Sequence, residues 1–100
     1  MLKNFRTYQL AVAFYKNAMA KQLPAHLKDQ LRRAASSVVL NLAEGSAKAS
    51  IADRRRFYEI AFASFREVQA ILDISDITDL SEQADKLGAN LYCLRRSLTM

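Results

Sequence analysis

Apolar residues recur along this chain at steps of three and four residues, the spacing of one face of an α-helix. Four stretches show the pattern, with stripes formed by Tyr8, Val12, Tyr15 and Met19; by Leu27, Leu31, Ala34, Val38 and Leu42; by Phe57, Ala61, Ser64, Val68 and Ile71; and by Leu80, Ala84, Leu87, Leu91, Leu94 and Leu98. The pattern predicts four helices, and we expect these stripes to face a common core.

Stop and start signals separate the four stretches. Pro24 ends the first helix, because proline disfavours helical geometry in the residue before it. Gly45 is expected to end the second helix in a left-handed conformation, and Ser50 and Asp53 have the spacing of a capping box that opens the third. An acidic break at Asp76–Asp79 precedes the fourth helix. The chain is therefore predicted to be an all-α, antiparallel up-down four-helix bundle, one domain over residues 1–100.

The amino-acid composition agrees with an all-helical fold and indicates where in the cell the protein is expected. Apolar residues make up 51 % of the chain, which contains only two glycines and one proline, too few for a sheet protein rich in tight turns. Cys93 is the only cysteine, so no internal disulfide can form. The chain lacks an apolar run long enough to span a membrane, and its N-terminus lacks the apolar region of a signal peptide. We expect a cytoplasmic protein with no membrane partner.

Two helices carry more apolar surface than a four-helix core requires. In the third helix a second stripe, turned by about 100° from the first, contains Tyr58, Phe62, Phe65 and Leu72. The first helix likewise has Leu10 and Phe14 off its main stripe. Apolar patches of this kind mark interfaces. We therefore predict a homo-oligomer with an interface through Leu10, Phe14, Tyr58, Phe62 and Phe65; a bent helix that buries both stripes within one subunit is the alternative.

Charge is unevenly distributed in the sequence. Residues 1–66 hold 12 basic and 4 acidic residues, whereas residues 67–100 hold 3 basic and 6 acidic residues. The candidate nucleic-acid-binding residues are Lys28, Arg32, Arg33, Lys48, Arg54, Arg55, Arg56 and Arg66. Exposed guanidinium groups bind phosphate oxygens well. In the alternative interpretation these arginines pair with Glu44, Glu59, Glu67 or the acidic segment 73–79.

Polar residues beside the apolar stripes are expected to fix the register between helices. Asn41 follows Val38 by three residues and Ser64 lies on the third stripe, so both point inward. Because buried polar groups need partners, we predict a small interhelical hydrogen-bond set containing Asn41 and Ser64, joined by Glu44 or Arg56. We assign Gly45 a structural role as well.

The sequence offers little for catalysis. Its two glycines stand alone, so it contains no glycine-rich phosphate loop, and no Glu-x-x-His pair occurs. His26 is interpreted as a solvated residue at the start of the second helix, and Cys93 as a small core or boundary residue. We predict a protein that is not an enzyme and has no metal or other cofactor.

Three segments and one serine resemble a known family closely. They are Gln30–Val38 (QLRRAASSV), Asn41–Ser46 (NLAEGS) and Arg56–Ala61 (RFYEIA), followed by Ser64. The family is that of the four-helix-bundle proteins first seen as open reading frames in intervening sequences of bacterial large-subunit ribosomal RNA. The likeness extends from Phe5 to about Leu98, with differences at Leu40, where a small polar residue is common, at Ala63, which replaces a glycine, and at Lys48, where arginine is frequent.

The resemblance implies an up-down four-helix bundle that assembles as a homopentamer. Accessory proteins of diversity-generating retroelements form a related branch, and they bind nucleic acid and a reverse transcriptase through a basic barrel. By analogy, such a role here would rest on Arg32, Arg33, Lys48, Arg54, Arg55 and Arg56.

Two functional hypotheses follow from these observations. The first is an oligomeric bundle that binds RNA or DNA through a basic surface. The second is a structural or protein-interaction module with no nucleic-acid role, in which the arginines form ion pairs between subunits.

Overall fold

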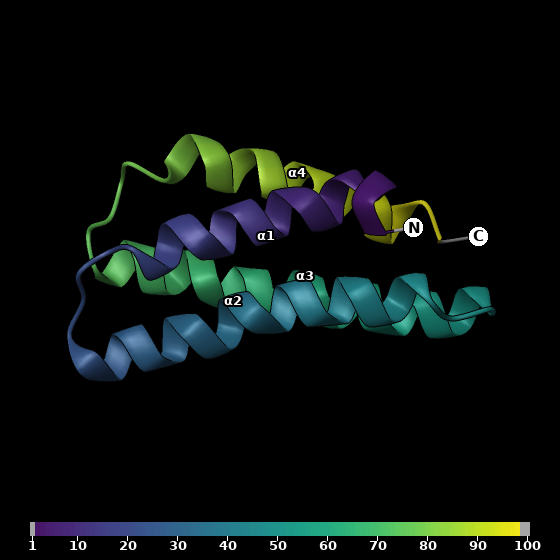
Figure 1. The fold of residues 1–100 in the computed structure, drawn as a ribbon, viewed down its shortest axis with the longest axis horizontal. Coiled ribbons are helices and arrows are strands. Elements are labelled where there is room, and N and C mark those ends of the chain that lie inside the picture. Colours follow the sequence, from purple (N-terminus) through teal and green to yellow (C-terminus); the bar gives the residue numbers. More distant parts are fainter. Residues whose placement is uncertain (1, 99–100) are drawn as a thin grey trace.

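A computed structural model describes residues 2–98, with Asn4 described by its backbone only, and four α-helices run through it in antiparallel, up-down order (Figure 1). The helices are α1 (Arg6–Met19), α2 (Ala25–Ser46), α3 (Ile51–Ile74) and α4 (Ser81–Arg96), and a short 3-10 turn, η1 (Leu2–Asn4), precedes them. The predicted all-α four-helix bundle is confirmed, and no strand occurs between residues 2 and 98.

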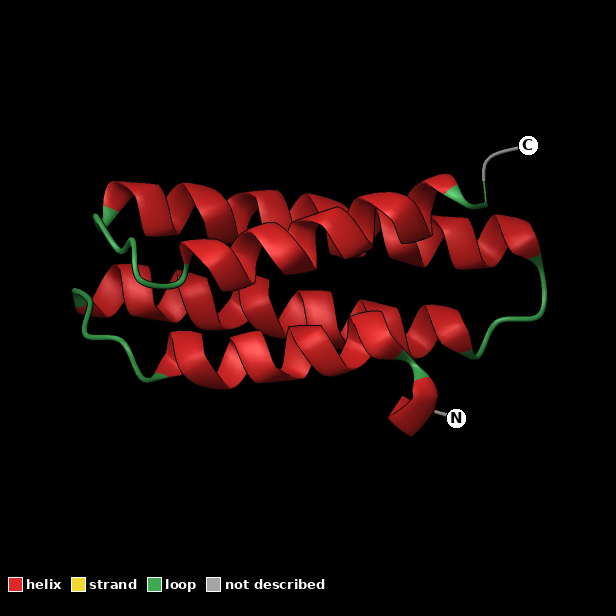
Figure 2. Ribbon diagram, turned by 90° about the horizontal axis from the view of Figure 1, so that it is seen from above, coloured by secondary structure: helices red, strands yellow, loops and turns green. Residues whose placement is uncertain are grey.

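The four helices form a closed ring around one core. Each helix packs against the helices before and after it in the chain, and α1 also packs against α4. The bundle is 40 Å long and 24 × 23 Å across. At 24 residues, α3 spans about 36 Å and runs nearly this whole length. Figure 2 shows that the α2–α3 connection lies at the same end as the chain termini, whereas the other two connections lie at the opposite end.

The core-facing side of α1 differs from the prediction. Thr7, Ala11, Phe14 and Ala18 are the buried residues of α1, whereas the predicted stripe of Tyr8, Val12, Tyr15 and Met19 is half-buried. The prediction was therefore wrong by one residue, or about 100° of rotation around the helix. Both stripes are spaced for a helix, and the inner one combines two alanines with Phe14, whose ring packs in the core.

The predicted faces of the other three helices are confirmed in their main parts. In α2, Leu31, Ala34, Val38 and Leu42 are buried while Leu27 is half-buried. In α3 the main stripe is buried except at the half-buried Ser64. The fourth stripe is buried from Leu80 to Leu91 and half-buried at Leu94 and Leu98.

The second stripe of α3 faces the core and not a partner. Tyr58, Phe65 and Leu72 are buried because α3 packs against both α2 and α4 and needs a wide apolar face. Phe65 meets the buried Phe14 edge-to-face, with 5.8 Å between ring centroids. The prediction that Phe14, Tyr58 and Phe65 form an oligomer interface is therefore wrong. Leu10 and Phe62 are half-buried and remain candidates for such an interface.

Helix ends follow the predicted signals except at Pro24 and Gly45. Helix α1 already ends at Met19, and Pro24 is the N-cap of α2. The Ser50 side chain caps α3 by accepting a hydrogen bond from the Asp53 backbone N–H, at 3.1 Å. Helix α2, however, continues through Gly45 to Ser46, and neither glycine has a positive φ. Among residues 2–98, the residue with left-handed geometry is Asp76, with φ 56°, in the connection from α3 to α4. Gly45 is therefore not a stop residue.

No helix within residues 2–98 has the length and apolar character needed to cross a membrane.

Candidate nucleic-acid interface

The net charge of the protein is concentrated at one end of the bundle. The helix halves nearest to the chain termini and the α2–α3 connection comprise residues 2–12, 36–62 and 88–98 (Figure 1). We call this half the basic end. It holds eight of the 15 Lys and Arg but only three of the 10 Asp and Glu, and therefore carries the whole formal charge of +5. The other half is neutral, with seven residues of each sign.

Two cations of the basic end lie over the buried ring of Phe57, and Arg54 joins them through a hydrogen bond; we call Lys48, Arg54 and Arg56 the basic cluster. Lys48 Nζ lies 5.2 Å from the centroid of this ring, and the Arg56 Cζ atom lies 4.5 Å from it. Arg54, in the first turn of α3, donates its Nε–H to the Lys48 carbonyl at 2.9 Å. Cation–π contact and the carbonyl therefore hold the side chains together even though their charges repel one another.

Arg55 has a different position from its neighbours. Its guanidinium is half-buried and donates from Nε and Nη2 to the Leu98 carbonyl, at 3.2 and 2.8 Å. It thus ties the chain after α4 to the start of α3. We assign it a structural role, with its charge still contributing to the basic end.

Carboxylates do not neutralise the basic cluster. Ion pairs within residues 2–98 join Lys21 to Asp79, Arg32 and Arg33 to Asp29, and Arg95 to Glu59. None of them involves Lys48 or the three arginines 54–56. The alternative prediction, that these arginines pair with acids of the same chain, is therefore not met at this cluster.

Other predicted binding residues lie elsewhere. Arg32 is 14 residues before the end of α2, or about 21 Å along the helix axis from the basic cluster. It pairs with Asp29, while Lys28 donates from Nζ to the Lys21 carbonyl at 2.6 Å. The structure thus separates Lys28, Arg32 and Arg33 from the residues of the α2–α3 connection.

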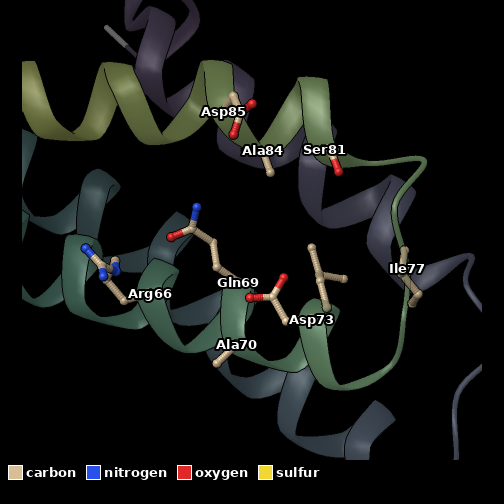
Figure 3. Close-up of a pocket in the computed structure, with 9 residues that line it drawn as sticks. Arg66, Gln69, Ala70, Asp73, Ile77, Ser81, Ala84 and Asp85 are labelled. Atoms are coloured by element: carbon tan, nitrogen blue, oxygen red, sulfur yellow. The ribbon is translucent and has the colours of Figure 1, made fainter.

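Arg66 also lies outside the basic end, 12 residues or about 18 Å along α3 from Arg54. It lines a hollow of about 340 Å³ between α3 and α4, together with Gln69, Asp73 and Asp85 (Figure 3). Its surroundings are acidic on the α4 side. Arg66 is therefore not part of the same phosphate-binding surface.

Sequence reasoning missed Arg95 and Arg96 in the last turn of α4. Arg95 lies at the basic end, paired with Glu59 at 3.2 Å, and its Cζ atom is 4.2 Å from the ring centroid of Phe62. The available signal was the up-down topology itself, because an antiparallel bundle places the end of the fourth helix beside the start of the third.

The predicted interhelical hydrogen-bond set exists, with a different third member. Ser37 and Ser64 share a hydrogen bond of 2.8 Å between their hydroxyl oxygens. Asn41 donates from Nδ2 to the Ser37 carbonyl at 2.8 Å and to the Ser37 hydroxyl at 3.1 Å. Ser37 is thus the link, and the side chains of Glu44 and Arg56 are not part of this set. The set joins α2 to α3 and fixes their register.

Gly45 allows the same two helices to approach closely. A Cβ atom at this position would lie 2.8 Å from Cε1 of Tyr58 and 2.9 Å from Cβ of Phe57. The structural role predicted for Gly45 is therefore to allow a close approach between α2 and α3.

Tyr58, which lies against Gly45, has a perturbed phenol. The burial of Tyr58 raises the pKa of its phenol above the ordinary value of 10.0, while the positive charge of Arg54 acts in the opposite direction.

Candidate catalytic groups are exposed and isolated. His26 is exposed in the first turn of α2, as predicted. Cys93 is exposed on α4, so its predicted place in the core or at its boundary is wrong. No group of three His, Cys, Asp or Glu in the described part of the chain could hold a metal ion.

Comparison with known protein families identifies the class of this bundle. The family model described as 23S rRNA-intervening sequence protein matches residues 3–99, nearly the whole chain. The protein belongs to this family, which confirms the resemblance found in the sequence. Searches of curated proteins and of solved structures returned no match.

Proposed function

We propose that this protein is a non-enzymatic, self-associating helical bundle whose basic end binds the phosphate backbone of RNA or DNA. One observation carries the proposal: Lys48, Arg54 and Arg56 gather at the end that holds the whole net charge, and no carboxylate among residues 2–98 pairs with them. An exposed cation without an acidic partner is available to a phosphate, and guanidinium groups contact phosphate oxygens through two N–H donors.

The position of these cations supports a role beyond stability. Arg54 stands in the first turn of α3, where the helix dipole is positive and a cation is unfavourable by a few tenths of a kcal/mol or more. The bundle is 40 Å long, so the acids of the far half lie about 20 Å away, beyond the screening length of about 8 Å at physiological salt. They therefore leave the field of the basic end nearly intact.

Self-association is supported by apolar surface that the bundle leaves uncovered. Leu40 is 63 % exposed and borders an apolar hollow of about 130 Å³ between α1 and α2, lined also by Val12, Tyr15 and Val39. Ile60 on α3 is 40 % exposed. With Leu10 and Phe62, these residues offer contacts to a second copy. Five copies, the number that the resemblance implies, would carry about +25 and attract phosphate over a longer range.

A protein-interaction module is the second candidate, favoured by the acidic far portion of α3 and α4. Residues 63–87 hold two Lys and Arg against six Asp and Glu, a net charge of −4. This surface is complementary to the basic end of another copy. If the arginines serve only that contact, they form ion pairs between subunits and leave no free site for nucleic acid.

One experiment distinguishes nucleic-acid binding from a protein-interaction module. It measures the fluorescence anisotropy of labelled RNA and DNA across a series of salt concentrations and records the native mass of the same sample. The proposal predicts binding whose log affinity falls with log salt by about 0.9 per phosphate contact on duplex DNA. A protein that changes its native mass with salt but binds neither RNA nor DNA at low salt supports the interaction module and contradicts the proposal.

We also propose that the protein acts in the cytoplasm. Its single cysteine cannot form an internal disulfide, and disulfides are typical of secreted proteins.

A further inference from the structure

An aromatic pair lies on the α3–α4 seam, within the basic end. The rings of Phe62 and Tyr92 have centroids 6.4 Å apart with planes inclined at 53°. Phe62 is half-buried, whereas Tyr92 is 43 % exposed and is the only aromatic residue among the large exposed hydrophobic side chains of the described chain. A large ring on a surface rich in cations is the usual arrangement at sites for unpaired bases.

The pair continues a row of contacts that starts at Arg55, in the first turn of α3 next to the basic cluster. Three contacts follow one another along the seam: Arg55 with the Leu98 carbonyl, Glu59 with Arg95, and Phe62 with Tyr92. Because the two helices are antiparallel, the residue numbers rise along α3 while they fall along α4. Seven residues of α3 separate Arg55 from Phe62, or about 10 Å. The ring of Tyr92 is therefore within reach of a strand whose backbone lies on the basic end.

Two arginines hold the aromatic pair and leave part of the Tyr92 ring open. The Cζ atom of Arg95 lies 4.2 Å from the Phe62 centroid and 5.5 Å from that of Tyr92, while Glu59 fixes its guanidinium. Arg96 donates from Nη1 to the Tyr92 hydroxyl at 3.3 Å, with Cζ 5.9 Å from the ring centroid. Arg96 thus sits at the hydroxyl end of the ring rather than over its centre.

We infer that Tyr92, supported by Arg95 and Arg96, is a stacking platform for an unpaired base, and that the ligand of the basic end is single-stranded nucleic acid. The inference rests on the proposed function, because the basic end must hold the phosphates while the ring receives the base. Bases inside a duplex are stacked on each other and do not offer a face to Tyr92. Cation–π contact from the flanking guanidinium groups adds to the stacking.

The test compares Tyr92→Ala with Tyr92→Phe, which keeps the ring and serves as the matched control. The probes are a single RNA strand of roughly twelve nucleotides, the DNA strand of the same sequence, and the corresponding duplexes. Tyr92→Ala is expected to weaken binding of the single strands by roughly tenfold, the effect of one stacked base, with the salt slope unchanged. Tyr92→Phe and duplex binding are expected to stay within about twofold. The RNA and DNA arms show which kind of strand is preferred.

A spectroscopic measurement on the unaltered protein tests base stacking even if Tyr92→Ala fails to fold. A strand carrying 2-aminopurine loses fluorescence when that base stacks, so quenching is expected on binding. Binding without quenching, equal losses for strand and duplex, or a change in native mass with unchanged strand affinity would each overturn the platform. If the unaltered protein binds neither strand nor duplex, the proposed function itself fails, which is a distinguishable result.

Discussion

Gly45 of α2 lies so close to Tyr58 of α3 that a single added carbon would overlap its ring. The Cβ atom would stand 2.8 Å from Tyr58 Cε1, and the Phe57 Cβ atom, only 2.9 Å away, is attached directly to the backbone. The ring could turn aside, but the Phe57 Cβ can move only with the helix. Gly45 therefore sets the distance between α2 and α3 at the basic end.

Gly45→Ala is expected to destabilise the bundle. Alanine improves helix propensity by about 1 kcal/mol over glycine, but overpacking a tight contact costs about 1–3 kcal/mol. We expect a net loss of up to about 2 kcal/mol in the free energy of unfolding, measured by urea denaturation. Gly88→Ala is the matched control, since its Cβ would meet only the edge of the Phe65 ring, at 3.1 Å. The control should be near neutral; equal losses in the two variants would contradict the special role of Gly45.

The burial of Tyr58 should make the stability of the folded protein decrease at alkaline pH. Because the pKa of this phenol is raised above 10.0 in the folded protein, the unfolded chain loses its proton first as pH rises. Above about pH 10 the folded state therefore binds more protons than the unfolded state, and stability falls with increasing pH. Below that pH the contribution is fully present.

Comparison with Tyr58→Phe isolates this titration from that of the lysines. Urea midpoints should fall more steeply for the unaltered protein than for the variant between about pH 9 and pH 11. Parallel curves for the two proteins would mean that the Tyr58 phenol is not buried as described.

The Ser37–Ser64 hydrogen bond should appear as a coupling energy. Ser37→Ala removes the link to both Asn41 and Ser64, whereas Ser64→Ala removes one bond. Each single variant is expected to lose about 1 kcal/mol, and the double variant less than the sum by about 0.5–1.5 kcal/mol. Strict additivity in this double-mutant cycle would contradict a direct bond between the two hydroxyls.

Neighbouring arginines at the start of α3 should respond differently to substitution. Arg55→Gln loses two charge-assisted bonds to the Leu98 carbonyl, so we expect a loss of about 1 kcal/mol in unfolding free energy. Arg54→Gln loses one exposed hydrogen bond to the Lys48 carbonyl but also removes an unfavourable cation from the first helical turn, so its net effect should be near zero. Thermal denaturation of both variants checks this order, and the reverse order would contradict the assigned roles.

Much of the fold could be predicted from the sequence because its signals are local. The leucine stripe of α4 and the Ser50 cap each depend on residues within one helix, and both were correct in type and place. The face of α1 was not, because two helically spaced stripes lie side by side and only packing against neighbouring helices selects which one is buried. The prediction that Gly45 ends α2 was wrong for a similar reason. The glycine is required by the close approach of Tyr58 from another helix, and sequence signals within α2 do not reveal that contact.

The candidate site was only partly predictable. The run Arg54–Arg56 opens α3 as expected, but charge counted along the sequence could not show that Arg95 joins the same end while Arg32 and Arg66 do not. That distribution arises from antiparallel folding. The different part played by Arg55 likewise depends on a carbonyl 43 residues away in sequence.

The most direct test of the central claim is to neutralise two cations at either end of the bundle and compare nucleic-acid binding. Arg54→Gln with Arg56→Gln removes two charges at the basic end, and Arg32→Gln with Arg33→Gln removes the same charge elsewhere. Both pairs are exposed, so each variant should remain folded. In salt-dependent anisotropy titrations, we expect the first pair to lower the salt slope by about two and weaken binding at least tenfold, and the second pair to do neither. Equal effects of the two pairs would show attraction by net charge alone and contradict a binding site at the basic end.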